Sequence, residues 1–202
     1  LLSMKTKIKA VVFDAGGVIT EWRKPLTRFF TEIDVTVEEW VAAIEPDEEI
    51  ANKGLLEPDE CFKRIMKRLD REDQWLRLRE VSPGSFERIE ETFALLEELQ
   101  GRFRLALLTN ALSGSVDQLD RKVKLKKYFE VIIDSSAVGM VKPDKRIFLL
   151  TCQRLGLKPQ QCLFIDDDEK NIKAAQKLGF QTVHFTEPKT GVALVKKKLG
   201  LG

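Results

Sequence analysis

Lys9-Ala-Val-Val-Phe-Asp14-Ala-Gly-Gly-Val-Ile19 joins a short apolar run to a carboxylate and a pair of glycines. The β-branched and aromatic residues before Asp14 are typical of a buried strand. Gly16 and Gly17 permit backbone conformations that a Cβ would forbid, so they predict a tight turn after the strand. Open α/β sheets bind ligands at this place, although many buried strands end in Asp only as a cap. A functional assignment therefore depends on matching groups at the ends of other strands.

The composition limits the class of protein. The chain has 202 residues, of which 43% are hydrophobic, so we expect one compact core with an inserted module. A formal net charge of +2 gives no field that would attract nucleic acid or an anionic membrane. No apolar run is long enough for a membrane span and no secretory signal is recognisable, so a cytoplasmic setting is expected. The oligomeric state stays open. The three cysteines, which form no Cys-x-x-Cys pair, are expected to be buried free thiols.

Residues 20–82 have helical periodicity and predict a small helical cap inserted after the first strand. The tetrapeptide Glu-Pro-Asp-Glu occurs at 45–48 and at 57–60. Both copies are interpreted as helix starts, because Pro suits the first helical position and acids favour the N-terminal dipole. Calcium loops would need an alternating ligand pattern with a central Gly. Trp22, Trp40 and Trp75 are expected to pack inside the cap, with a ligand-facing Trp as the alternative.

Beyond Pro83-Gly84, strands and helices alternate. Strands are predicted at 104–108, 131–134, 162–165 and 181–185, and helices at 86–100, 113–122, 144–155 and 170–178. Such alternation predicts an α/β fold, in which helices cover both faces of a parallel sheet.

Four strand ends carry polar groups that could act together. The first ends in Asp14, and the second ends in Thr109-Asn110 before a helix start, where exposed N–H groups favour an anion. The third leads to Lys142-Pro-Asp, and the fourth ends in Asp166-Asp167-Asp168. Taken singly, Thr109 is explained as a cap and Lys142 as a surface charge. Several acids at one strand end repel one another unless a cation neutralises them, and their oxygen ligands favour a hard ion such as Mg²⁺.

The four groups, in this order, resemble the haloacid dehalogenase superfamily of hydrolases. The resemblance rests on Phe13-Asp14-Ala-Gly-Gly-Val, Leu107-Leu-Thr109-Asn, Lys142-Pro-Asp and Phe164-Ile-Asp166-Asp167 with Asn171. Within the superfamily the chain looks most like phosphatases related to the N-terminal domain of soluble epoxide hydrolase and to sugar-1-phosphate phosphatases. The resemblance implies a Rossmann-like sheet of order 5-4-1-2-3. It also implies a core formed by residues 1–20 and 85–202 and a helical cap formed by residues 21–84, which closes over small substrates.

The resemblance further implies an Mg²⁺-dependent phosphatase that acts on small phosphorylated metabolites. Asp14 is expected to attack phosphorus and form an aspartyl-phosphate. Thr109, the backbone near Asn110, and Lys142 are expected to bind the phosphoryl oxygens. Lys142 is also expected to keep Asp14 ionised.

The implied metal ligands are the carboxylates of Asp14 and Asp167 and the backbone carbonyl of Gly16. Asp166 is expected to act through water or hydrogen bonds and is counted among the catalytic residues.

Gly16 departs from the pattern of the superfamily, because most of its phosphatases have a second Asp at this position. The side chain that is missing here is the general acid/base, which is typically worth roughly 10²–10⁴ in rate. We therefore expect a preference for phosphates with good leaving groups, such as acyl or aryl phosphates. Glu21 is expected to be solvated at the cap hinge, with a role as substitute acid as the alternative. His184, the only histidine, is expected to have a structural or partly exposed position.

Two other functions stay open at this stage. The first is a metal-independent haloacid dehalogenase. Its pattern has a Tyr where this chain has Gly16, so Gly16 and the acids Asp166 and Asp167 argue against it. A catalytically impaired protein could instead bind a phosphorylated ligand or another protein.

Overall fold

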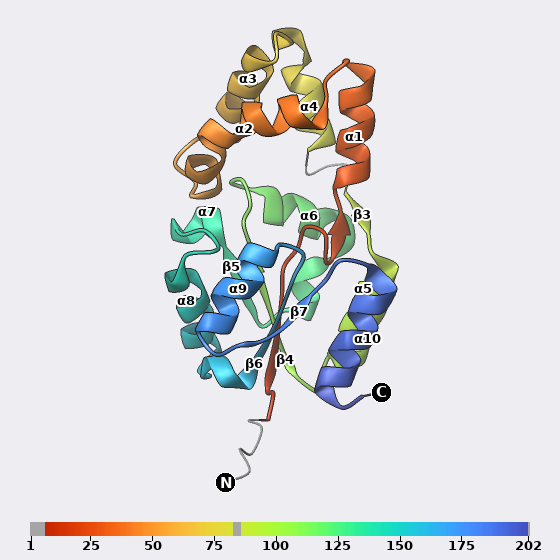
Figure 1. Cartoon of the computed structure of the whole chain (residues 1–202), viewed down its shortest axis with the longest axis vertical. Helices are drawn as coiled ribbons and strands as arrows, with labels where there is room; N and C mark the ends of the chain where they lie inside the picture. The colour runs from red at the N-terminus through yellow and green to blue at the C-terminus, as the bar shows by residue number, and fades with distance from the viewer. Residues whose placement is uncertain (1–6, 83–85, 202) are drawn as a thin grey trace.

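The computed structural model describes residues 7–82 and 86–201, and its centre is a five-stranded parallel sheet (Figure 1). Read from the β7 end and counted in chain order within this sheet, the strand order is 5-4-1-2-3, as the resemblance implied. The strands are β1 (Ala10–Phe13), β4 (Arg104–Thr109), β5 (Val131–Asp134), β6 (Cys162–Asp166) and β7 (Gln181–His184). Strand β1 is central and pairs with β4 and β6, so Asp14 directly follows the middle of the sheet.

Alternate residues of the strands face two separate apolar clusters, which explains why the strands are apolar throughout. Val11 and Phe13 belong to one cluster, and Val12 belongs to the other. Helices α5 (Glu90–Leu99), α6 (Ser115–Val123) and α10 (Pro188–Leu199) contribute to the first cluster. Helices α8 (Lys145–Leu155) and α9 (Glu169–Lys177) contribute to the second, while the short α7 (Ser135–Val138) follows β5. The predicted α/β architecture is therefore confirmed, with both faces of the sheet covered.

Four helices form a separate group beyond the C-terminal ends of the strands, at the top of Figure 1. They are α1 (Arg23–Glu32), α2 (Val37–Asn52), α3 (Pro58–Arg68) and α4 (Trp75–Val81). They have an apolar cluster of their own, against which Trp22, Trp40 and Trp75 pack. We call these helices the cap. The expected boundary at 84/85 and the Pro83-Gly84 turn lie outside the described residues, so the division into 21–84 and the remainder stays a proposal.

Two predictions of local structure are wrong. The segment 86–100 is not helical from its start, because β3 (Glu87–Arg88) pairs antiparallel with β2 (Thr20–Glu21) and α5 begins only at Glu90. This short ribbon pairs the segment that leads from the core into the cap with the segment that returns to the core. The amphipathic spacing that places Phe86 and Ile89 on the helical stripe cannot reveal pairing with a distant segment.

The Glu-Pro-Asp-Glu at 57–60 starts a helix as predicted, but the copy at 45–48 lies inside α2. Pro46 interrupts the hydrogen bonding of that helix, which normally disfavours such a position. Asp47 is buried there, and its carboxylate lies 2.5 Å from Arg68 and 3.4 Å from Arg64 on α3. Helix α2 continues through Pro46, and the next residue, Asp47, forms these contacts with α3.

The three cysteines are buried and free, as predicted. Among residues 7–82 and 86–201, no helix is long and apolar enough to cross a membrane.

The loop after α2 rests on the core beside β5. The hydroxyl of Ser135 donates a hydrogen bond of 2.6 Å to the carbonyl oxygen of Asn52. Gly54 has a φ of +71°, and a Cβ there would lie 2.4 Å from the carbonyl oxygen of Ser136. The glycine therefore permits both the left-handed backbone and the close approach of the cap loop to the core.

We predict that Gly54→Ala destabilises the protein more than Gly101→Ala does. Gly101 has a similar φ of +78°, but a Cβ at that position would meet nothing within 4 Å, so it controls for backbone strain alone. Gly101→Ala should lower the free energy of unfolding by about 1–2 kcal/mol. The clash at Gly54 should add about 1–3 kcal/mol. Urea unfolding measures both variants, and equal losses would contradict the close cap–core contact.

Candidate active site

Asp14 lies at the C-terminal end of β1, where its backbone N–H donates to the carbonyl oxygen of Ile165 on the neighbouring β6. Its carboxylate is close to two other charged groups. The Nζ atom of Lys142 lies 2.8 Å from Asp14 Oδ1 and 2.6 Å from Asp166 Oδ2. The side chain of Lys142 is 2% exposed and that of Asp166 is fully buried, so this three-residue ion cluster is shielded from solvent.

Asp166 is held by further donors around its carboxylate. The side-chain amide of Asn171 donates to both oxygens at 3.1 and 3.2 Å, and the backbone N–H of Asp168 donates to Oδ1 at 2.8 Å. These hydrogen bonds satisfy a buried charge that would otherwise be costly. Asp166 is thus fixed in orientation and in turn fixes Lys142.

The backbone of Lys142 is positioned by Asn110, which follows β4. The Asn110 amide accepts from the Lys142 N–H at 2.8 Å and donates to the Lys142 carbonyl at 3.0 Å. The peptide bond between Lys142 and Pro143 is cis. The side chain of Asn110 therefore joins the second sequence motif to the backbone of the third.

Burial raises the pKa of Asp14 to about 7, against the lowering effect of the Lys142 ammonium. The neighbouring Asp166 and Asp167 carboxylates add to the rise. Burial alone would lower the pKa of Lys142, but attraction to Asp14 and Asp166 outweighs it and the pKa is raised. Lys142 therefore keeps its charge at neutral pH, while Asp14 lacks a second counterion.

Asp167 brings a third carboxylate to this place. One oxygen from each of Asp14, Asp166 and Asp167 lies within 4.8 Å of the others. Lys142 supplies one positive charge for Asp14 and Asp166 together, so the buried cluster has an excess of negative charge. Oxygen donors with excess negative charge fit a hard divalent cation such as Mg²⁺.

Arg23, the first residue of α1 in the cap, also contacts this group. Its guanidinium lies 2.6 Å from Asp167 Oδ2. No sequence motif indicated this pair, because its partners lie 144 residues apart. The contact links the cap to the acidic cluster and occupies an oxygen that a cation would use.

Gly17 permits Asp167 to approach the loop after β1. Its φ is +74°, and a Cβ would lie 2.3 Å from Asp167 Oδ2. The second glycine predicted as a turn residue is therefore needed for space as well as for backbone conformation.

A cavity of about 540 Å³ opens between the cap and the C-terminal edge of the sheet. Gly16, Thr109 and Asn110 line it from the core, and Trp22 and Trp40 line it from the cap side. Two of the three tryptophans thus pack in the cap and also face the cavity, so the ligand-facing alternative applies to them. Sequence periodicity placed both residues in the cap but could not show which of them borders the space below it.

Glu21 and His184 lie beside the site without lining this cavity. The Glu21 carboxylate accepts a hydrogen bond of 2.7 Å from the backbone N–H of Arg23 at the start of α1. His184 is exposed, and its Nε2 lies 3.0 Å from the carbonyl oxygen of Asp167. The expectation of a partly exposed His184 agrees with this position, although the ring does have a backbone partner.

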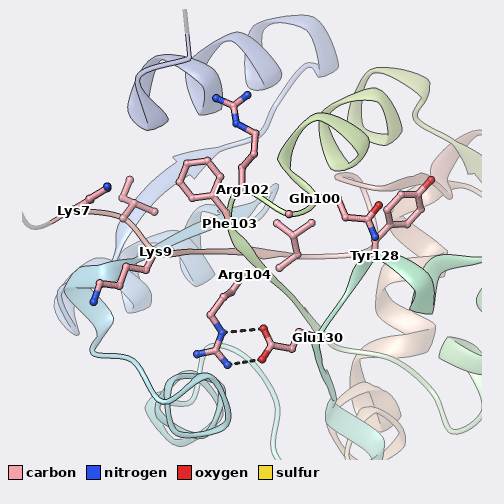
Figure 2. Close-up of a pocket in the computed structure, with 11 residues that line it drawn as sticks. Lys7, Lys9, Gln100, Arg102, Phe103, Arg104, Tyr128 and Glu130 are labelled. Carbon is pink, nitrogen blue, oxygen red and sulfur yellow. Dashed lines mark hydrogen bonds and ion pairs between the residues drawn. The ribbon is translucent and has the colours of Figure 1, made fainter.

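Another hollow, of about 630 Å³, lies at the opposite edge of the sheet, near the N-terminal ends of β1 and β4. Figure 2 shows Lys7, Lys9 and Arg102 spread around it, while Arg104 is paired with Glu130 at 2.6 Å. None of the four strand-end motifs reaches this hollow. The strand-end segments contribute Gly16, Thr109 and Asn110 to the lining of the cavity under the cap instead.

A family model described as haloacid dehalogenase-like hydrolase matches residues 8–179. The chain belongs to this family. The match spans all four strand-end motifs and all four cap helices, so the family resemblance of the sequence is confirmed.

Relatives of this haloacid dehalogenase-like hydrolase include phosphatases. A sesquiterpene phosphatase from Aspergillus oryzae is 25% identical over 187 residues, which cover 91% of this chain and 93% of that protein. Acyl-CoA dehydrogenase family member 10 of Mus musculus is 41% identical over 75 residues, but they cover 37% of this chain and only 7% of that protein. A haloacid dehalogenase family enzyme from Bacteroides thetaiotaomicron, solved with magnesium and inorganic phosphate, is 25% identical with a TM-score of 0.68. That similarity covers 87% of this chain and 92% of the other.

We predict that Lys142→Met lowers the free energy of unfolding by about 3–5 kcal/mol in the presence of a chelator, because it leaves two buried carboxylates unpaired. Lys126→Met is the matched control. Lys126 forms an equally short pair of 2.6 Å with Asp117, but both side chains are about half exposed. Exposed pairs contribute little, so the control should keep its stability. Chemical denaturation compares the two variants, and similar stabilities would contradict a buried ion cluster.

We also predict that Arg23→Ala strengthens Mg²⁺ binding, because it frees Asp167 Oδ2. The guanidinium is 54% exposed, so the gain should be at most about fivefold. Isothermal titration with MgCl₂ measures the affinity, with Arg28→Ala on the exposed side of the same helix as control. Weaker binding in Arg23→Ala would show that Arg23 orients Asp167 rather than competing for it.

Proposed function

We propose that this protein is an Mg²⁺-dependent phosphatase of small phosphorylated metabolites that forms an aspartyl-phosphate on Asp14. The observation that carries the proposal is the position of the Asp14 carboxylate. It lies 2.8 Å from the Lys142 ammonium and beside two further carboxylates, at the edge of the sheet where the cavity opens. The phosphatases among the relatives support the same reaction class.

In the proposed reaction, one carboxylate oxygen of Asp14 attacks phosphorus and the bond between phosphorus and the ester oxygen breaks. The alcohol leaves and takes a proton, and water then attacks the aspartyl-phosphate to release inorganic phosphate and restore Asp14. Lys142 holds Asp14 Oδ1 in place and offsets charge on the phosphoryl group. Thr109 and the backbone near Asn110 line the cavity beside Asp14 and would bind the other phosphoryl oxygens.

The residues that would hold Mg²⁺ are Asp14 and Asp167, through their carboxylates, and Gly16, through its carbonyl oxygen. Asp166 would act behind them, since its carboxylate is already occupied by Lys142, Asn171 and a backbone N–H. When bound, the ion supplies positive charge that reduces repulsion between the carboxylate and the phosphate dianion. The Bacteroides thetaiotaomicron relative, solved with magnesium and inorganic phosphate, supports this cofactor.

Gly16 offers no side chain that could protonate the leaving alcohol. The Glu21 carboxylate already accepts a hydrogen bond from the Arg23 N–H, which argues against a substitute acid. The leaving oxygen would therefore take its proton from water. A preference for aryl or acyl phosphates, whose leaving groups need little protonation, follows from this arrangement.

A haloacid dehalogenase proper and a non-catalytic binding protein are less well supported. The three clustered carboxylates fit a cation, whereas the dehalogenase reaction needs none. Release of chloride from 2-haloacids without Mg²⁺ would favour the dehalogenase. Retention of the whole ion cluster around Asp14 favours catalysis over binding alone.

We predict that Asp14→Asn lowers Mg²⁺-dependent hydrolysis of para-nitrophenyl phosphate by more than about 10³-fold, because the nucleophile is lost. Asp168→Asn is the control at the same sheet edge. Asp168 caps α9 by accepting the Lys170 N–H at 2.7 Å, a role that Asn performs equally well. Its turnover should stay near that of the natural protein. Activity that survives in Asp14→Asn, or that ignores chelation of the metal, would exclude the proposed mechanism.

A further inference from the structure

The cavity under the cap is mainly apolar on the side away from Asp14. Its walls come from the cap on one side and from the segment that leads into α6 on the other. The apolar side chains that form them are Trp22, Leu26, Trp40, Ile44, Phe62 and Leu112. Small-molecule sites with such walls bind the apolar part of a ligand and use a few polar groups for orientation.

One face of α2 forms the roof of this cavity. Trp40, Val41 and Ile44 follow one another at helical spacing, and Ala51 continues the same face. Val41 is 55% exposed although it borders the cavity, so an apolar surface next to the site is left in contact with water. Covering that surface with an apolar group would be favourable.

The charged residues around the cavity disfavour a second anionic group on the ligand. Glu45 and Glu48 stand on the α2 side, and among the lining residues that the structure describes Lys170 is the one basic side chain. A substrate with a carboxylate or a second phosphate far from Asp14 would meet two acids of the cap. The hydroxyl-rich surface of a sugar would find mostly hydrocarbon there.

We propose that the substrate is a phosphate monoester of an apolar alcohol, with an aromatic ring or an alkyl chain that fills the cavity under the cap. This inference rests on the proposed function, since it places the phosphate at Asp14. The apolar side chains of the cavity walls then contact the leaving group, and Glu45 and Glu48 disfavour acidic competitors. Specificity comes from the cap and from the segment before α6, whereas the reaction comes from the strand ends.

A series of para-alkylphenyl phosphates tests the proposal, because the alkyl chain lengthens while the acidity of the leaving phenol stays nearly constant. The value of kcat/KM should rise about two- to fourfold for each added methylene until the cavity is full. Para-propylphenyl and para-(carboxyethyl)phenyl phosphate form a pair of similar size. The apolar member should be preferred at least about tenfold, because burial of an unpaired carboxylate is costly.

Val41→Asp should weaken this chain-length dependence, because it places a charged side chain in the apolar roof of the cavity. Val37→Asp is the matched control, since Val37 is 54% exposed on the same helix and does not line the cavity. Binding of para-octylphenyl phosphonate to Asp14→Asn, followed by tryptophan fluorescence, gives a measurement that does not depend on turnover. Trp22 and Trp40 would report its arrival from the cavity wall.

The outcomes separate the two proposals. Turnover that is equal along the series, or higher for the carboxyethyl ester, overturns the apolar substrate class but leaves a phosphatase. If no substrate is hydrolysed, the proposed function fails and phosphonate binding decides the remaining question. Binding that strengthens with chain length supports an apolar phosphorylated ligand in this cavity, and absence of binding overturns it.

Discussion

Lys142 lies between two buried carboxylates, and the arrangement of the site depends on this contact. A single ammonium group cannot neutralise both Asp14 and Asp166, so the cluster combines strong attraction with a remaining negative charge. Asn171 and the Asp168 N–H stabilise Asp166 from the other side, which leaves Asp14 as the carboxylate with fewer partners. Burial raises the pKa of Asp14, and the neighbouring Asp166 and Asp167 carboxylates raise it further against the effect of Lys142. A divalent cation or a second positive group would neutralise the remaining negative charge, which supports the proposal of a cation site here.

The parallel sheet supplies these groups from segments far apart in the chain. Because β1 lies between β4 and β6, the residues that follow these three strands lie close together at one edge of the sheet, although they are far apart in the sequence. Asn110 then fixes the Lys142 backbone, and Gly17 lets Asp167 come close to the loop after β1. Each of these features would be ordinary alone. Their common position at the C-terminal edge makes them a site.

Much of this could be predicted from the sequence, because strand signals and strand-end motifs are local patterns. Strand β5 has the predicted bounds, and Lys142 forms ion pairs with Asp14 and Asp166, while the catalytic roles of these residues stay predictions. The failures have a different cause. Pro46 lies within α2, where the buried Asp47 contacts α3. Strand β2 pairs with β3, although the whole cap separates these two strands in the sequence. Both features depend on tertiary contacts, which local patterns do not show. The contact of Arg23 with Asp167 belongs to the same class.

In the proposed reaction, the core supplies the reacting groups and the cap binds the leaving group. This division matters because Gly16 provides no acid side chain. A phosphatase with a general acid can protonate a poor leaving group while the ester bond breaks. Without that acid, the rate depends more on how well the leaving group is held and how readily it departs. An apolar cavity provides binding energy from the part of the substrate that does not react, and an aromatic ring attached to the ester oxygen provides an easily displaced phenolate. Under the proposed function, the absence of a side-chain acid at Gly16 and the apolar face of α2 support the same kind of substrate for independent physical reasons.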